Sequence, residues 1–83
     1  MKLEWQRGGD GFATDLDLLL DGRLYGWVRW YPGSARLYAK VRPALGGEEV
    51  RFDSLRPAMR WLKERSVIDI ISGRIPRNPE EWR

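Results

Sequence analysis

The 83-residue sequence contains no cysteine and no histidine. Without cysteine, neither disulfide bonds nor thiolate metal sites can stabilise the fold. Without histidine, the chain lacks the commonest general base and the commonest metal ligand. No apolar run approaches the roughly 20 residues that span a bilayer, and MKLEWQRGG lacks the apolar stretch of a signal peptide. We therefore expect a small cytoplasmic protein that has no enzyme activity, metal, cofactor or membrane partner.

Other combinations of residues that carry chemistry are also missing. The spacing of Asp10, Asp15, Asp17 and Asp21 does not match a calcium-binding loop. The glycines near residue 10 are not followed by the Lys and Ser/Thr of a phosphate loop. The adjacent glutamates at 48–49 and 80–81 diverge on an extended chain, so neither pair forms an acid/base couple. Binding is the class of function that remains.

Positive charge is concentrated in the middle of the chain. Residues 22–66 carry ten basic and four acidic side chains, whereas residues 1–21 carry two and five. Twelve of the 15 cations are arginine. Arginine favours planar contacts with phosphates, carboxylates and aromatic rings, although compositional bias of the genome explains the preference equally well.

Alternating apolar and polar residues predict an α+β fold, an antiparallel β-meander of four to five strands backed on one face by a C-terminal α-helix. The expected strands are residues 3–7, 12–20, 24–31, 35–42 and 48–52. A helix follows, capped by Asp53 or Ser54, with an apolar face at Leu55, Ala58, Met59 and Leu62. We interpret Arg56, Arg60 and Lys63 as a solvated basic ridge. Residues 67–73 favour a short second helix over a strand, and we divide the chain into one domain, 1–73, and an extended tail, 74–83.

The hairpin of residues 24–42 contains five aromatic and four basic residues, and alternation sorts its side chains onto two faces. The core set is Leu24, Gly26, Val28, Trp30, Leu37, Ala39 and Val41. A two-residue Asp21-Gly22 turn before this hairpin would point Leu16 and Leu18 away from the core, so we expect a three-residue connection, Asp-Gly-Arg, with a bulge.

The opposite set forms an aromatic and basic face, bordered by Asp15 and Asp17, which we predict to be the binding site. Its members are Tyr25, Trp27, Arg29, Tyr31, Arg36, Tyr38, Lys40, Arg42 and Arg51. Such rings stack on nucleobases, and Trp, Tyr and Arg are also enriched at protein-binding hot spots. Two alternatives remain open: the rings serve only to stabilise the sheet, or the tail covers them through Ile75 and Trp82.

Residues 24–63 resemble two kinds of DNA-binding domain in the segments WVRW, RLYAKV and VRFDSLRPAMRWL. These are the plant AP2 domains and the arm-binding domains of phage-type integrases, although the alanine-rich helical run of AP2 domains is absent. The resemblance implies that Trp27, Arg29, Arg36, Tyr38 and Lys40 face DNA.

A strand that ends in Phe52-Asp53-Ser54 runs into a Trp-containing helix. In this motif, in its length and in its order of elements, the whole chain resembles small phage anti-CRISPR proteins, which are built as an antiparallel sheet followed by helices. That resemblance implies an inhibitor that binds a host protein or nucleoprotein complex without catalysis, and this is the function we favour. The alternatives are direct binding of DNA or RNA through the same face, and a homodimerising structural domain. The sequence does not fix the oligomeric state.

Overall fold

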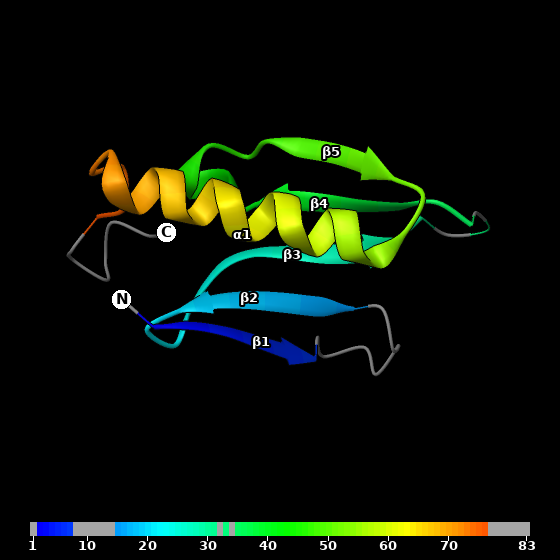
Figure 1. Cartoon of the computed structure of the whole chain (residues 1–83), viewed down its shortest axis with the longest axis horizontal. Coiled ribbons are helices and arrows are strands. Elements are labelled where there is room, and N and C mark those ends of the chain that lie inside the picture. The colour runs from blue at the N-terminus through cyan, green and yellow to red at the C-terminus, as the bar shows by residue number, and fades with distance from the viewer. Residues whose placement is uncertain (1, 8–14, 32, 34, 77–83) are drawn as a thin grey trace.

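A computed structural model describes residues 2–7, 15–31, 33 and 35–76. Within these residues, five antiparallel strands form one sheet in chain order, and one α-helix packs on one of its faces (Figure 1). The strands are β1 (Leu3–Arg7), β2 (Leu16–Leu20), β3 (Arg23–Trp30), β4 (Leu37–Val41) and β5 (Glu49–Phe52); a 3₁₀ turn (Pro43–Leu45) precedes β5, and the helix is α1 (Leu55–Ile71). The predicted α+β meander is confirmed.

The helix is longer than the sequence suggested. It begins after Ser54 and runs without interruption to Ile71, so the separate short helix that we expected after residue 66 is wrong. The buried stripe that starts at Ala58 and Leu62 continues through Ser66 and Asp69, which keeps the second half of the helix on the same face of the sheet. Gly73, with a φ of 74°, then allows the chain to turn away.

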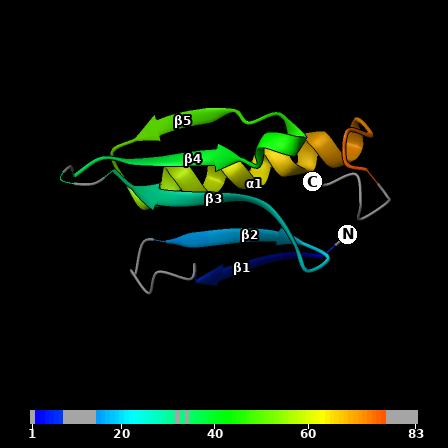
Figure 2. The same cartoon turned by 180° about the vertical axis from the view of Figure 1, so that it is seen from behind.

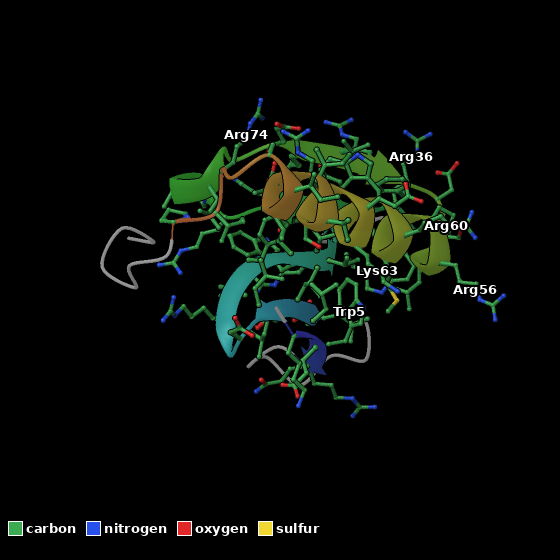
Figure 3. The ribbon with its side chains drawn as sticks, turned by 60° about the vertical axis from the view of Figure 1, so that its left-hand side comes forward. Trp5, Arg36, Arg56, Arg60, Lys63 and Arg74 are labelled. Atoms are coloured by element: carbon green, nitrogen blue, oxygen red, sulfur yellow. The ribbon has the colours of Figure 1, made fainter. Side chains whose placement is uncertain are left out.

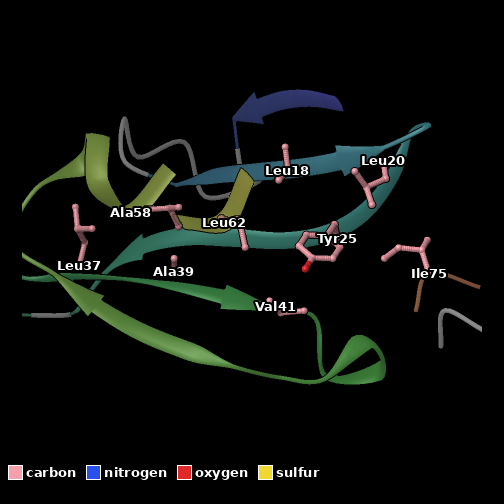
Figure 4. Packing of buried hydrophobic residues seen from close by; sticks show 10 residues of the cluster. Leu18, Leu20, Tyr25, Leu37, Ala39, Val41, Ala58, Leu62 and Ile75 are labelled. Carbon is pink, nitrogen blue, oxygen red and sulfur yellow. The ribbon is translucent and has the colours of Figure 1, made fainter. Parts of the chain in front are cut away.

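The core lies between α1 and the face of the sheet formed by β3, β4 and the adjoining part of β2 (Figures 1 and 2). Its members are Leu18, Leu20, Tyr25, Val28, Leu37, Ala39, Val41, Ala58, Leu62 and Ile75 (Figure 4).

Trp30, which we expected in the core, is 39% exposed because it is the last residue of β3. Ile75, which we assigned to the tail, packs into the core on the helix side and does not cover the other face. Trp82 lies outside the described residues.

The β2–β3 hairpin corrects our prediction for the turn. Asp21 and Gly22 both have positive φ, 50° and 80°, and Leu20 pairs directly with Arg23, so the two-residue turn that we rejected is present. The register then shifts between Leu18 and Leu19. The bulge that we expected in the turn therefore lies two residues further along, and it still directs Leu16, Leu18 and Leu20 toward the core.

The extra residue in this bulge is Tyr25, because Leu18 pairs with Gly26 while Leu19 pairs with Leu24. The bulge turns Tyr25 to the helix side, where its side chain is fully buried. Our assignment of Tyr25 to the exposed binding face is therefore wrong. Leu24, placed by us in the core, is only partly buried and lies across from Leu19.

Tyr25 joins the sheet to the helix through a buried polar network. Its hydroxyl donates a 2.6 Å hydrogen bond to Oδ2 of Asp69, which is 1% exposed. Nε of Arg65 lies 3.8 Å from Oδ1 of the same carboxylate, and Arg65 also pairs with Glu48 just before β5. One network thus connects β3, the last turns of α1 and the start of β5.

We expect this network to make the protein sensitive to high pH. Burial, and secondly the hydrogen bond to Asp69, raise the pKa of Tyr25 above its ordinary value of about 10. Above about pH 10, unfolded chains lose the tyrosine proton and folded chains keep it, so stability falls as pH rises, by up to about 1.4 kcal/mol per pH unit. Urea unfolding from pH 8 upward measures this slope. Tyr25→Phe should flatten it; a Tyr25→Phe protein that keeps the slope of the wild type would contradict the assignment.

Candidate functional site

The face of the sheet opposite α1 brings together aromatic, basic and acidic side chains, and we call it the open face. Strand register sets its rows: Asp17, Trp27, Lys40 and Glu49 face one another across β2 to β5, and Arg29, Tyr38 and Arg51 form the next row. Tyr31 and Arg36 form a third row just beyond the ends of β3 and β4, where a backbone hydrogen bond joins them. Within the described ranges, α1 is the only α-helix, and it lies on the other side (Figure 2).

Arg29 is held in place at the centre of the open face. Its guanidinium carbon lies 5.1 Å from the ring centroid of Trp27. Its nitrogens lie 3.4 Å from Oδ1 of Asp17 and 4.0 Å from Oδ1 of Asp15, whose side chain is only 9% exposed. The two carboxylates offset the arginine charge and fix its guanidinium over the indole. As we expected, Asp15 and Asp17 border this face.

The second cluster on the open face is aromatic. The ring centroids of Tyr31 and Tyr38 are 4.7 Å apart, and the rings are tilted by 43°. The guanidinium carbon of Arg51 lies 5.4 Å from the Tyr31 ring, and the Tyr31 hydroxyl donates a 3.1 Å hydrogen bond to Oε2 of Glu49. Each ring is therefore positioned before any partner arrives, which lowers the entropy lost on binding.

The structure gathers six of the nine predicted site residues into this surface: Trp27, Arg29, Tyr31, Tyr38, Lys40 and Arg51. The exposed Arg36 lies near its edge and pairs with Asp53 at 3.7 Å. Arg42 follows β4, and its guanidinium lies 3.5 Å from the carbonyl oxygen of Leu24. Tyr25 is the one member that lies on the opposite side.

Sequence reasoning missed Glu49 as a member of the open face. The signal was available, because Glu49 and Arg51 are two positions apart on one strand and must share a face. With Glu49, three carboxylates, those of Asp15, Asp17 and Glu49, lie among the clustered cations of the face. Its chemistry is that of a pre-ordered surface of mixed charge, suited to binding.

Comparison of the chain with models of known families, with curated proteins and with solved structures finds no match. Among the described residues, no helix is long and apolar enough to cross a membrane. Function must therefore be argued from the surfaces themselves.

Proposed function

We propose that this protein is a non-catalytic inhibitor, encoded by a phage or mobile element, that binds the protein surface of a host nucleic-acid-processing complex of the CRISPR–Cas kind through its open face. The resemblance of the chain to small phage anti-CRISPR proteins supports the class of target. The order of elements, a sheet followed by a helix, agrees with that resemblance.

The observation that carries the proposal is charge compensation on the open face. Arg29 is paired with Asp15 and Asp17, and Lys40 lies across the ladder from Glu49. These carboxylates would repel the phosphates of a nucleic acid. A protein surface can offer complementary groups of both signs, and it gains most from fixed Trp, Tyr and Arg side chains. The open face therefore fits a protein partner better than a phosphate backbone.

The proposal predicts that Trp27→Ala with Tyr38→Ala weakens binding of the target by about 30-fold or more, because truncating a hot-spot residue costs about 2 kcal/mol or more. The measurement is capture from nuclease-treated host lysate on the immobilised protein, followed by calorimetric titration of the captured complex. Trp30→Ala is the matched control, since Trp30 is an exposed tryptophan on the helix side of the sheet. It should bind like the wild type.

Three results would contradict this assignment. If the double variant and the wild type capture the same proteins with the same affinity, the open face is not the site. If nuclease treatment abolishes capture, the face binds nucleic acid directly. If sedimentation shows a dimer that Trp27→Ala dissociates, the face is a homotypic interface.

A further inference from the structure

The exposed side of α1 carries a row of three cations, Arg56, Arg60 and Lys63, which we call the helix ridge. All three are exposed, and Figure 3 shows the side chains of Arg56 and Arg60 extending away from the body of the protein. With a rise of about 1.5 Å per residue, the spacings of four and three residues separate them by about 6 Å and 4.5 Å along the helix. In the part of the chain that the structure describes, none of the three side chains makes an ion pair or a hydrogen bond; Lys63 contributes only its backbone carbonyl, which accepts a hydrogen bond from Ser66.

Several other cations of the fold have carboxylate partners, which the three members of the helix ridge lack among the described residues. On the same helix, Arg65 pairs with Glu48 and Asp69. On the open face, Arg29 is held by two aspartates. Among the residues of α1, Glu64 is the one exposed acidic residue beside the helix ridge, so this side of the helix carries an excess of positive charge. Uncompensated charge on a rigid helix attracts a polyanion at little conformational cost.

We propose that the helix ridge binds the phosphate backbone of a nucleic acid. Two of its three members are arginines, whose planar guanidinium groups donate paired hydrogen bonds to phosphate oxygens. A shallow depression borders the ridge, lined by Arg60, Lys63, Glu64, Val67 and Ile68. Its aliphatic part offers contact to a sugar or base beside the bound phosphates.

A membrane surface fits this side of the helix less well. Helices that lie on membranes bury an apolar stripe along their length. The lengthwise apolar stripe of α1 is already packed on the sheet through Ala58 and Leu62. The exposed aliphatic residues, Val67, Ile68 and Ile71, lie only toward the C-terminal end of the helix.

The helix ridge and the open face lie on opposite sides of the sheet, since α1 packs on the side that Figure 1 shows in front. Two different partners can therefore bind at once. The inference does not depend on the proposed function, because it uses none of the residues of the open face.

The test is fluorescence anisotropy of a labelled short single strand and of the matching duplex, titrated with the full chain from low to physiological salt. Duplex affinity should fall with salt with a log–log slope of about 2–3, as expected for three neutralised phosphates. Arg56→Gln, Arg60→Gln, Lys63→Gln should weaken binding at low salt by about 10-fold or more and reduce the slope by about 2. Glutamine retains helix propensity, so the fold is preserved, and circular dichroism checks this.

Lys2→Gln, Arg7→Gln, Arg74→Gln is the matched control, because it removes the same net charge from exposed residues that lie outside α1 and outside the proposed site on the open face. It should keep most of the affinity and slope. Equal losses in both triple variants, or no binding of either oligonucleotide at low salt, would overturn the proposal. So would binding to phosphatidylserine vesicles without binding to oligonucleotides.

The same variants separate the two proposals. The helix-ridge variant should still bind the protein partner of the open face, and Trp27→Ala with Tyr38→Ala should still bind oligonucleotides. If the latter variant alone loses oligonucleotide binding, the nucleic-acid site lies on the open face and the helix-ridge proposal is wrong. If Trp27→Ala with Tyr38→Ala still binds both the protein partner and the oligonucleotides, only the proposed function of the open face is wrong.

Discussion

Asp69→Ala is expected to lower the free energy of unfolding by about 3 kcal/mol, because it removes a buried charged partner from two groups at once. The Tyr25 hydroxyl would lose its 2.6 Å hydrogen bond in the core, and Arg65 would keep only Glu48. A domain of this size has a total stability of about 4–12 kcal/mol. The substitution therefore removes a large share of it. Urea unfolding followed by circular dichroism measures the loss.

Two further variants identify the cause of this loss. Tyr25→Phe should cost less, about 1–3 kcal/mol, since it leaves the Asp69 carboxylate near Arg65 but removes its one hydrogen-bond donor. Tyr25→Phe with Asp69→Leu should recover much of the stability, because it removes both buried polar groups and keeps the volume filled. If Asp69→Ala unfolds within about 0.5 kcal/mol of the wild type, the network has no stabilising role.

Much of the fold and most of the open face follow from periodicity in the sequence. Alternation placed Val28, Ala39 and Val41 on one side of the sheet and Trp27 and Lys40 on the other, as observed. Alternation determines a face whenever a strand is regular, because neighbouring side chains must point in opposite directions. It therefore fails only where the strand is irregular.

Tyr25 shows this failure and its cause. A regular strand after the two-residue Asp21-Gly22 turn would point Leu16 and Leu18 away from the core, whereas burial of these leucines needs the opposite orientation. We resolved this conflict by rejecting the turn. The chain satisfies both by inserting one residue into β3 at the bulge. The position of a bulge depends on which side chain gains from burial across the sheet, here through Asp69. That gain involves residues 44 positions apart, so local pattern does not reveal it.

Asp69 was missed for a related reason. Charged residues are seldom fully buried unless paired, so a helical aspartate is normally assigned to solvent. The spacing did hold a signal, because Asp69 continues the stripe of Ala58, Leu62 and Ser66. An acid on the buried stripe of a helix predicts a partner on the facing sheet, and Tyr25 is that partner.

Gly26→Ala is expected to destabilise the protein by about 3 kcal/mol through overpacking. Gly26 lies on β3 beneath α1, paired with Val41. A Cβ atom built there would clash with the carbonyl oxygen of Lys40 and would lie 2.8 Å from Cδ1 of Leu62. Replacing glycine by alanine ordinarily stabilises by about 0.4–1 kcal/mol through the unfolded chain. The clash outweighs that gain, and urea unfolding measures the net change.

The two clashes differ in kind, and a second variant separates them. The end of the Leu62 side chain can rotate away, whereas the Lys40 carbonyl is fixed in the β3–β4 ladder. Leu62→Ala alone should cost about 2–5 kcal/mol by leaving a cavity. If the backbone contact dominates, Gly26→Ala destabilises the Leu62→Ala protein by as much as it destabilises the wild type. If Gly26→Ala instead stabilises the Leu62→Ala protein, the Leu62 side chain is the obstacle, and the contact with the Lys40 carbonyl does not cause the loss of stability. Because Trp27 faces Lys40 at the next position, a clash with the backbone also displaces the open face. In that case Gly26→Ala should weaken partner binding even in the fraction of molecules that remain folded.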